Sequence, residues 1–340
     1  MARRLNIAIV GATGAVGEAL LSVLEERNFP LDKLYLLASE RSVGRTMVFK
    51  NREYPVDDLH DFDFSKADIA LFSAGSEISK VYAPIAAAAN CVVVDNTSCF
   101  RYEDDIPLVV PEVNAHRIAD YKKRNIIANP NCSTIQMVVA LKPLHDVAGI
   151  SRINVATYQA VSGTGKKAIS ELISQVGELL NGRPVKPSVY PQQIAFNVLP
   201  HIDDFQDNGY TREEMKMVWE TKKIMEDEAI LVNPTTVRVP VIYGHSEALH
   251  VEFKKPLSVA DARKLLTKAP GVKLVDNVAK LEYPTALSHA VGKDEVFVGR
   301  LRQDISHPNG LNMWVVADNV RKGAATNAVQ IAEILQSEYL

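Results

Sequence analysis

The feature that most constrains the fold is an apolar strand that runs directly into a glycine-rich turn and then a helix. The apolar run LNIAIV occupies 5–10, and the turn GATGAVG at 11–17 follows it immediately. Apolar residues then recur at helical spacing over 14–27. A strand, a glycine turn and a helix in this order are typical of the first βα unit of a doubly wound sheet, where the helix N-terminus holds a phosphate group.

The first 130 residues repeat this alternation of apolar strands and helices. Further strands are predicted at 34–38, 68–74, 91–95 and 125–128, and a further helix at 77–89. Strands that are apolar throughout and separated by helices predict a parallel sheet covered on both faces. We therefore expect a Rossmann-like, doubly wound dinucleotide-binding domain over 1–130 in a protein of the α/β class.

After Pro130 the pattern changes to that of an α+β domain, which we expect over 131–318. A long helix is predicted from Asn131 to about His145, and the segment 181–210 is rich in Pro and Gly and predicted to be irregular. Strands with period-two alternation are predicted at 152–161, 235–241, 248–254, 296–304 and 311–318, and helices at 164–180, 211–227 and 258–268. This alternation favours a mostly antiparallel sheet with one covered face.

Composition excludes several classes of protein. The 340 residues carry a formal net charge of −3, which gives no reason to expect nucleic acid or an anionic membrane as a partner. No apolar stretch approaches the ~20 residues of a membrane span, and the N-terminal apolar run is broken at Gly11, which argues against a signal peptide. Three cysteines do not form a disulfide framework, so we expect a cytoplasmic protein.

The glycine turn and the end of the second strand bear on the cofactor. The turn has the spacing GxxGxxG rather than GxGxxG, so an ordinary strand-to-helix turn remains an alternative to a dinucleotide site. The second strand ends in Ser39, Glu40, Arg41 and Ser42. Arg41 with its flanking serines suits the 2′-phosphate of NADP, whereas Glu40 suits the ribose of NAD. A solvated polar loop is the third possibility.

The segment NPNCST at 129–134 places a cysteine at the start of a helix. Asn131 is a suitable N-cap, and Cys132 then lies in the first turn, where thiol pKa values fall from about 8.5 into the range ~3.5–7.5. An inert core cysteine is the alternative, and it is our interpretation of Cys91; the position of Cys99 in a polar loop leaves its role open. A thiolate beside a nicotinamide suggests acyl transfer to sulfur followed by hydride reduction, which requires an acid/base group. None of the eight histidines stands out locally.

A series of segments resembles, in order and over nearly the whole chain, the signatures of bacterial aspartate-β-semialdehyde dehydrogenases. They are GATGAVG, LASERSVG, DNTSCFR, PLVVPEVN, NPNCST, TYQAVSGTG, REEMK, VRVPVIYGHSEA and DNVRKGAA. The resemblance implies reduction of L-β-aspartyl phosphate by NADPH to L-aspartate semialdehyde and inorganic phosphate. That step leads to lysine, threonine, methionine, isoleucine and diaminopimelate. It also implies a homodimer, no metal, and a C-terminal stretch, 319–340, that returns to the dinucleotide-binding domain.

The resemblance also assigns residues to roles. Cys132 is similar to the acyl-accepting nucleophile, His245 to the acid/base group, and Gln159 to a residue that positions the substrate. Arg238 resembles the partner of the substrate α-carboxylate, and Glu213 the partner of its amino group. The phosphate-binding residues would be Arg101, Lys216 and Asn131. The cofactor contacts would be Gly11, Thr13, Gly14, Ala15, Val16, Ser39, Arg41, Ser42, Ser162, Gly163 and Asn319.

Other interpretations remain open for single residues and for the whole chain. Glu213 and Lys216 have the i,i+3 spacing of an ordinary surface pair. N-acetyl-γ-glutamyl-phosphate reductase shares the chemistry, but Glu213 and Arg238 suit a free amino acid better than an acylated one. A non-catalytic paralogue should have lost Cys132 or His245, and both are present. Cys99 departs from the small residue common in the family, which would bring a second thiol near the phosphate site.

Overall fold

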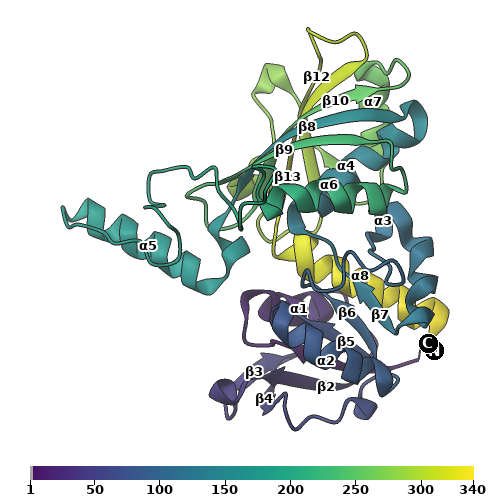
Figure 1. The fold of residues 1–340 in the computed structure, drawn as a ribbon, viewed down its shortest axis with the longest axis vertical. Coiled ribbons are helices and arrows are strands. Elements are labelled where there is room, and N and C mark those ends of the chain that lie inside the picture. The colour runs from purple at the N-terminus through teal and green to yellow at the C-terminus, as the bar shows by residue number, and fades with distance from the viewer. Residues whose placement is uncertain (1–2) are drawn as a thin grey trace. The chain divides into compact units, whose positions relative to one another are not determined.

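The computed structural model describes residues 3–340 and divides the chain into two compact units (Figure 1). The first unit holds the chain up to Asn131 together with Ala324–Leu340. The second unit is Cys132–Gly323. Among the described residues, no helix combines the length and the apolar character that a membrane span requires. The same part of the chain contains no group of His, Cys, Asp and Glu side chains arranged to hold a metal ion.

The first unit is built on a seven-stranded sheet in the order β3-β4-β2-β1-β5-β6-β7. Its strands are β1 Leu5–Val10, β2 Leu31–Ala38, β3 Thr46–Phe49, β4 Arg52–Asp58, β5 Ile69–Phe72, β6 Val92–Asp95 and β7 Ile126–Ala128. All neighbouring strands are parallel except β3 and β4, which form an antiparallel hairpin at the edge. The predicted parallel, doubly wound sheet is therefore confirmed. The edge hairpin was not predicted, because β3 is only four residues long and β4 is mostly charged and exposed.

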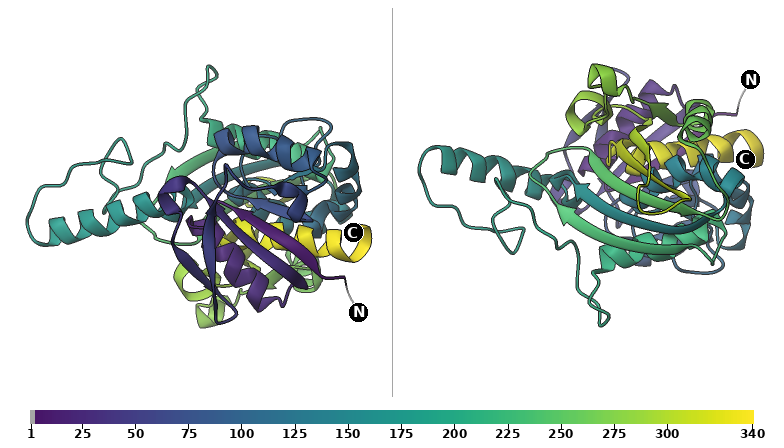
Figure 2. Two further views of the ribbon diagram at one scale, coloured as in Figure 1. Left: turned by 90° about the horizontal axis from the view of Figure 1, so that it is seen from below. Right: turned by 90° about the horizontal axis from the view of Figure 1, so that it is seen from above.

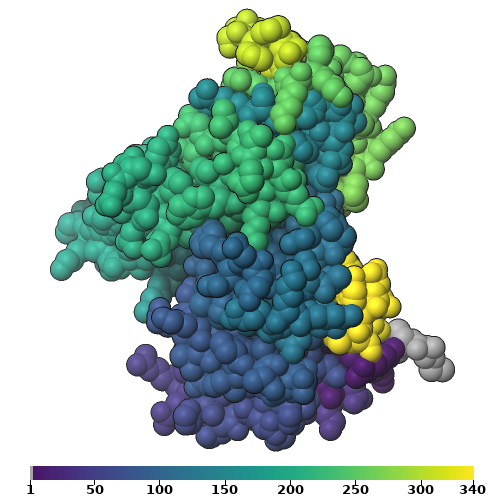
Figure 3. Space-filling model, turned by 45° about the vertical axis from the view of Figure 1, so that its right-hand side comes forward, coloured from purple at the N-terminus to yellow at the C-terminus, as the bar shows by residue number. Residues whose placement is uncertain are grey.

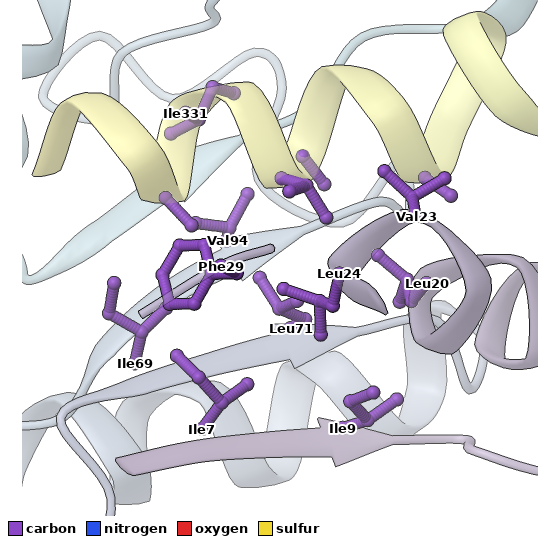
Figure 4. Packing of buried hydrophobic residues seen from close by; sticks show 14 of the residues in the cluster. Ile7, Ile9, Leu20, Val23, Leu24, Phe29, Ile69, Leu71, Val94 and Ile331 are labelled. Carbon is purple, nitrogen blue, oxygen red and sulfur yellow. The ribbon is translucent and has the colours of Figure 1, made fainter. Parts of the chain in front are cut away.

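Helices cover this sheet, and the C-terminal helix is one of them. The helices are α1 Ala15–Glu26, α2 Ser76–Ala88, the single-turn α3 Pro111–Asn114 and α8 Thr326–Ile334. Figure 4 shows Ile331 of α8 and Leu24 of α1 pointing into one core with Leu71 and Val94 of the sheet. An ion pair between Arg27 and Glu333 (2.7 Å) also links α1 to α8. Helix α8 therefore packs with the helices and sheet of the first unit.

The second unit contains a six-stranded sheet in the order β11-β12-β13-β10-β8-β9. Its strands are β8 Ile150–Gln159, β9 Leu231–Arg238, β10 His245–Phe253, β11 Val272–Leu274, β12 Val296–Gln303 and β13 Gly310–Ala317. Pairing is antiparallel for β8–β10, β10–β13 and β12–β13, and parallel for β8–β9 and β11–β12. The helices α4 Cys132–Ala148, α6 Arg212–Met225 and α7 Val259–Lys268 pack on the sheet. The mostly antiparallel sheet with helices was predicted correctly.

One helix extends away from this sheet. Helix α5, Lys166–Leu180, and the segment after it project from the six-stranded sheet in both views of Figure 2, and the teal part of the chain protrudes on the left in Figure 3. The segment 181–210 contains turns and isolated bridges but no helix or strand, as predicted. Two buried side chains of α5 tie it down. The carboxylate of Glu171 accepts from Ser188, and the amide oxygen of Gln175 accepts from the backbone N–H groups of 194 and 195.

Candidate active site

Three polar side chains lie in one row at an edge of the six-stranded sheet. Arg238 ends β9, Gln159 ends β8 and is its register partner, and His245 begins β10. Because β10 runs antiparallel to β8, its first residue lies beside the last residue of β8. All three side chains are buried on the sheet face that the helices cover. The strand register thus brings together residues that are up to 86 positions apart in the sequence.

Glu213 lies next to this row and accepts hydrogen bonds from two side chains. Gln159 Nε2 donates to Glu213 Oε1 at 3.2 Å, and Lys216 Nζ donates to Glu213 Oε2 at 3.0 Å. Lys216 also donates to Asp203 at 2.7 Å. A capping box formed by Thr211 and its partner at N3 starts α6 and places Glu213 in the first helical turn. The i,i+3 pair considered from the sequence exists, but it is buried beside Gln159 and is not a surface pair.

The backbone of Gly163 lies close to both the guanidinium of Arg238 and the ring of His245. Arg238 Nη1 donates to the carbonyl oxygen of Ala160 at 2.7 Å. A Cβ atom on Gly163 would lie 2.9 Å from Arg238 Nη1 and 3.3 Å from His245 Nε2. Glycine is therefore required at 163 for the close approach of its backbone to both side chains. The predicted residues Gln159, Glu213, Arg238, His245 and Gly163 do belong to one constellation.

His245 is fully buried, and its two ring nitrogens are in different environments. Nδ1 accepts a hydrogen bond from the backbone N–H of Ala160 at 3.0 Å. Nε2 has no hydrogen-bond partner among the residues described. Burial, and then the neighbouring Arg238, lower the pKa of His245 to about 3. The ring is therefore neutral, and because Nδ1 accepts, its proton is on Nε2, on the side of Gly163.

Cys132 is the first residue of α4, as predicted, and is only partly exposed. Its position at a helix N-terminus exposes the thiol to the positive end of the helix dipole. A Cβ atom on Gly323 would lie 2.8 Å from Cys132 Cβ, so the chain passes close to the nucleophile only because residue 323 is glycine. Gly323 lies within the segment DNVRKGAA, where no local signal distinguishes it from other glycines.

Asn319, predicted as a cofactor contact, connects the loops on both sides of the site. Its side-chain oxygen accepts from the backbone N–H of Gly244 at 2.9 Å, and its amide donates to Ser162 Oγ at 2.9 Å. Gly244 precedes His245, and Ser162 precedes Gly163. Asn319 therefore holds two segments in place, the one that carries His245 and the one that carries Gly163. Ser162, Gly163 and Asn319 are brought together, as their grouping in the prediction requires.

The glycine turn of the first unit borders a cavity of about 600 Å³. Its lining includes Gly11, Thr13, Gly14, Ala38, Ser39, Glu40, Asp58, Leu59, His60, Ser73, Ala74, Ile78 and Tyr82. Gly11 adopts φ 87°, which favours glycine, and a Cβ atom on Gly17 would lie 2.3 Å from the carbonyl oxygen of Gly11. The close packing of the turn on α1 is that of a dinucleotide-binding turn. Ala15 and Val16 begin α1 directly after the turn.

The loop predicted to select the cofactor lies beside this cavity. Ser39 and Glu40 are among the lining residues. Arg41 is exposed and is not among them. Ser42 Oγ lies 3.4 Å from Thr13 Oγ1, so the loop contacts the glycine turn directly. Asp58, which ends β4, and His60, which follows it, also line the cavity. Neither was predicted from the sequence, because this strand was not predicted.

Two of the predicted phosphate-binding residues, Arg101 and Asn131, belong to the first unit. Arg101 is buried and donates to the carbonyl oxygen of Asn96 at 2.8 Å, and Asn131 is buried at the end of this unit. Lys216, their expected partner in phosphate binding, belongs to the second unit. Cys91 is fully buried and burial raises its pKa to about 12, in agreement with an inert core residue. Burial and the nearby Asp95 also raise the pKa of Cys99, which favours the unreactive thiol.

Comparison with known proteins gives a consistent result over the whole chain. Residues 6–121 match the model of a semialdehyde dehydrogenase NAD binding domain, and residues 141–322 match that of a semialdehyde dehydrogenase dimerisation domain. The chain is 74% identical over 340 residues to an aspartate-semialdehyde dehydrogenase of Legionella pneumophila, covering 100% of this chain and 98% of that protein. A structure of aspartate semialdehyde dehydrogenase II from Vibrio cholerae complexed with ASA has 59% identity and a TM-score of 0.98, over 99% of this chain and 100% of that one. The enzyme from Candida albicans, solved with NADP, has 25% identity and a TM-score of 0.77, over 98% of this chain and 99% of that one.

Proposed function

Because the chain belongs to the aspartate-semialdehyde dehydrogenase family, we propose that it converts L-β-aspartyl phosphate to L-aspartate semialdehyde, releasing inorganic phosphate. The step serves the synthesis of lysine, threonine, methionine, isoleucine and diaminopimelate, and we place the enzyme in the cytoplasm as a homodimer. The observation that carries the proposal is the row of Arg238, Gln159 and His245 on a sheet against which the helix of Cys132 packs. This row combines an anion-binding group, a polar positioning group and a proton donor beside a nucleophile.

Cys132 acts as the nucleophile in this mechanism. Its thiolate attacks the acyl carbon of the substrate, the carbon–oxygen bond to phosphate breaks, and an acyl-thioester forms on Sγ. A bound nicotinamide would supply the hydride that reduces this thioester. During this reduction His245 transfers the proton on Nε2 to the oxygen that gains negative charge. The same proton returns from this oxygen to Nε2 when the carbon–sulfur bond breaks, which releases the aldehyde and restores the thiolate.

The free amino acid is recognised at both of its charged groups. Arg238 offers a planar guanidinium to the α-carboxylate, and one of its nitrogens is already fixed on the carbonyl of Ala160. The carboxylate of Glu213 accepts hydrogen bonds from the substrate ammonium. The hydrogen bond that Gln159 donates to Glu213 connects this contact to the residue that positions the reacting group. An N-acylated substrate has no ammonium to pair with Glu213. This pairing favours the present proposal over N-acetyl-γ-glutamyl-phosphate reductase.

We assign phosphate binding to Lys216, Arg101 and Asn131. Lys216 is already held by two carboxylates, those of Asp203 and Glu213, so a phosphate must compete with them for its ammonium group. We expect the substitution Lys216→Leu to raise KM for inorganic phosphate in the reverse reaction and to change KM for the semialdehyde little. Arg101→Leu should have the same effect, and Arg238→Lys the opposite one. If Arg238→Lys and Lys216→Leu give the same kinetic pattern, this division of the site is wrong.

The cofactor of the family's first domain is a nicotinamide dinucleotide, and we propose NADP as the preferred form. The glycine turn with its cavity fits a dinucleotide, because the turn leads from β1 into the N-terminus of α1, whose backbone N–H groups favour a phosphate. The residues that would hold it are Gly11, Thr13, Gly14, Ala15, Val16, Ser39, Arg41, Ser42, Ser162, Gly163 and Asn319. Arg41 supports the preference for a 2′-phosphate, and Glu40 opposes it.

The deciding experiment is the reverse reaction with purified protein. We expect formation of NADPH from NADP and L-aspartate semialdehyde that depends on inorganic phosphate. N-acetylglutamate semialdehyde should not replace the substrate. Absence of phosphate-dependent turnover with aspartate semialdehyde would contradict the proposal, and turnover of the N-acetylated aldehyde alone would establish the rival function.

A further inference from the structure

A carboxyl group lies fully buried directly behind the candidate active site. Glu247 is two residues after His245 on β10, so both side chains point to the same face of the sheet. Its register partners on the neighbouring strands are Thr157 on β8 and Val315 on β13. The next row of the sheet, two residues further along, holds Val155, Leu249 and Met313 and is apolar. Glu247 therefore belongs to a polar row between the reacting row and the hydrophobic core.

The group that meets this carboxyl comes from the helix of the nucleophile. Gln136 is fully buried on α4, four residues after Cys132. Its amide lies near the carboxyl of Glu247 and lowers the pKa of that group. Neither oxygen of Glu247 and neither polar atom of the Gln136 amide meets the geometry of a hydrogen bond with any residue in the part of the chain that the structure describes. Four buried polar atoms are costly unless they satisfy one another.

The spacing of the two pairs along their elements matches. Four residues of an α-helix advance about 6 Å, and two residues of a strand advance about 6.6 Å. Gln136 follows Cys132 by four helical residues, and Glu247 follows His245 by two strand residues. Since α4 packs on β10, a contact between Gln136 and Glu247 fixes how far α4 can slide along the strand. It thereby fixes the position of Cys132 relative to His245.

The charge state of Glu247 follows from its surroundings. Burial raises the pKa of its carboxyl well above the usual range, and the amide of Gln136 offsets only part of this effect. The register partners Thr157 and Val315 are not titratable, and Glu214 reaches the sheet at the backbone N–H of Thr236 on β9, two strands away. A neutral carboxyl offers one donor and one acceptor, which complement the acceptor and donor of an amide.

We propose that Glu247 and Gln136 form an uncharged buried pair that sets the register between the turn bearing Cys132 and the strand end bearing His245. Glu247 is a positioning residue in this role, because it acts through α4 and touches no reacting atom. The role rests on the proposed function, since it concerns the alignment of that nucleophile with that acid/base group. It adds to the site a residue that the reaction itself does not use.

The test compares three variants at Glu247 and Gln136. Glu247→Gln keeps the shape and the neutral state, so kcat should stay within about threefold of the wild type. Glu247→Leu removes the pair, and loss of alignment should lower kcat by about 10- to 100-fold, with little change in KM for NADP. The double variant Gln136→Leu/Glu247→Leu leaves no unpaired polar group, so it should regain thermal stability while kcat stays low. Val315→Ala, in the same row, is the control for loss of packing and should lower stability without lowering kcat comparably.

A second measurement needs no substrate and separates this proposal from the proposed function. In the unfolded chain a glutamate titrates near pH 4.3, whereas in the folded protein Glu247 keeps its proton at higher pH. Its contribution to stability is therefore fully present below about pH 4.3 and is lost as pH rises toward the folded pKa. Glu247→Gln should remove this loss, so its Tm should exceed that of the wild type increasingly as pH rises above about 4.3.

Each outcome bears on the pair in a defined way. Wild-type kcat in Glu247→Leu, or recovery of kcat in the double variant, would show that the pair does not align the site. A kcat in Glu247→Gln as low as in Glu247→Leu would overturn the neutral state, as would an unchanged dependence of Tm on pH. If Glu247→Leu does not fold, the Glu247→Gln comparison still decides the charge state. An inactive wild type with the expected dependence of Tm on pH would remove the proposed function but keep the buried neutral carboxyl.

Discussion

The two units present their binding groups in different ways. In the first unit a contiguous glycine turn borders the cavity. This turn depends on its backbone conformation and on close packing of backbone atoms. In the second unit the site consists of buried side chains from three strands and two helices, held by hydrogen bonds among Glu213, Gln159 and Lys216. A backbone site fails when a side chain is added. A side-chain site fails when one is removed, so substitutions can distinguish the two kinds of site.

The largest effect is expected at the nucleophile. Cys132→Ala should abolish turnover because no other group at this position can carry the acyl intermediate. NADP binding, which we assign mainly to the backbone site of the first unit, should stay unchanged in a fluorescence titration. Mass spectrometry of the wild type with aspartate semialdehyde and no phosphate should find the adduct on Cys132. Substantial turnover by the alanine variant would refute the mechanism.

Next in size is the effect of His245→Asn, which should lower kcat by roughly 10²–10⁴-fold. The pKa of His245 is lowered to about 3 in the folded protein, whereas a histidine in the unfolded chain titrates near pH 6.5. The folded state therefore resists protonation, and stability is lost as pH falls below about 6.5. His245→Asn should remove this part of the acid dependence of Tm. Conversely, an unchanged Tm profile and an unchanged kcat would assign the acid/base role to another residue.

The two units also differ in how much of each can be predicted from the sequence. The reason is that one site is contiguous in the chain and the other is assembled from distant segments. In the first unit, strand 5–10, the turn 11–17 and helix α1 were predicted because each is encoded in one continuous segment. The hairpin of β3 and β4 was missed because β3 is short and β4 is mostly charged and exposed. The constellation in the second unit depends on strand register, which period-two patterns do not specify between distant segments. The residues of this constellation were identified through the family resemblance and not through local patterns.

Some of the site could not be predicted from either source. Asp203 comes from a segment that was predicted only as irregular surface, yet it holds Lys216 at 2.7 Å. The burial of Glu247 and Gln136 follows from the packing of α4 on β10, and neither residue is unusual in its own segment. Local patterns record the face on which a residue lies. They do not record which helix covers that face.

Two glycine substitutions compare the units directly. A Cβ atom on Gly17 would lie 2.3 Å from the carbonyl oxygen of Gly11, and backbone cannot move aside cheaply. We expect Gly17→Ala to lower stability by about 1–3 kcal/mol and to weaken cofactor binding. A Cβ atom on Gly163 would instead meet the side chains of Arg238 and His245, so Gly163→Ala should spare stability and raise KM for the semialdehyde. Thermal melts and kinetics measure both, and the reverse pattern would contradict the comparison.

The smallest effect is expected at the cofactor loop, where the first unit depends on a side chain. Arg41 is exposed, so any contact with a 2′-phosphate is screened by solvent and salt. We therefore expect Arg41→Ala to raise KM for NADP by roughly tenfold or less and to leave KM for NAD almost unchanged, because only NADP carries the charged group. Glu40 lines the cavity, and Glu40→Gln is the matched control: it should weaken NAD more than NADP. If both cofactors weaken equally in Arg41→Ala, the loop 39–42 does not select the cofactor. The preference would then have to arise elsewhere along the lining, where Asp58 and His60 are the remaining groups that can carry charge.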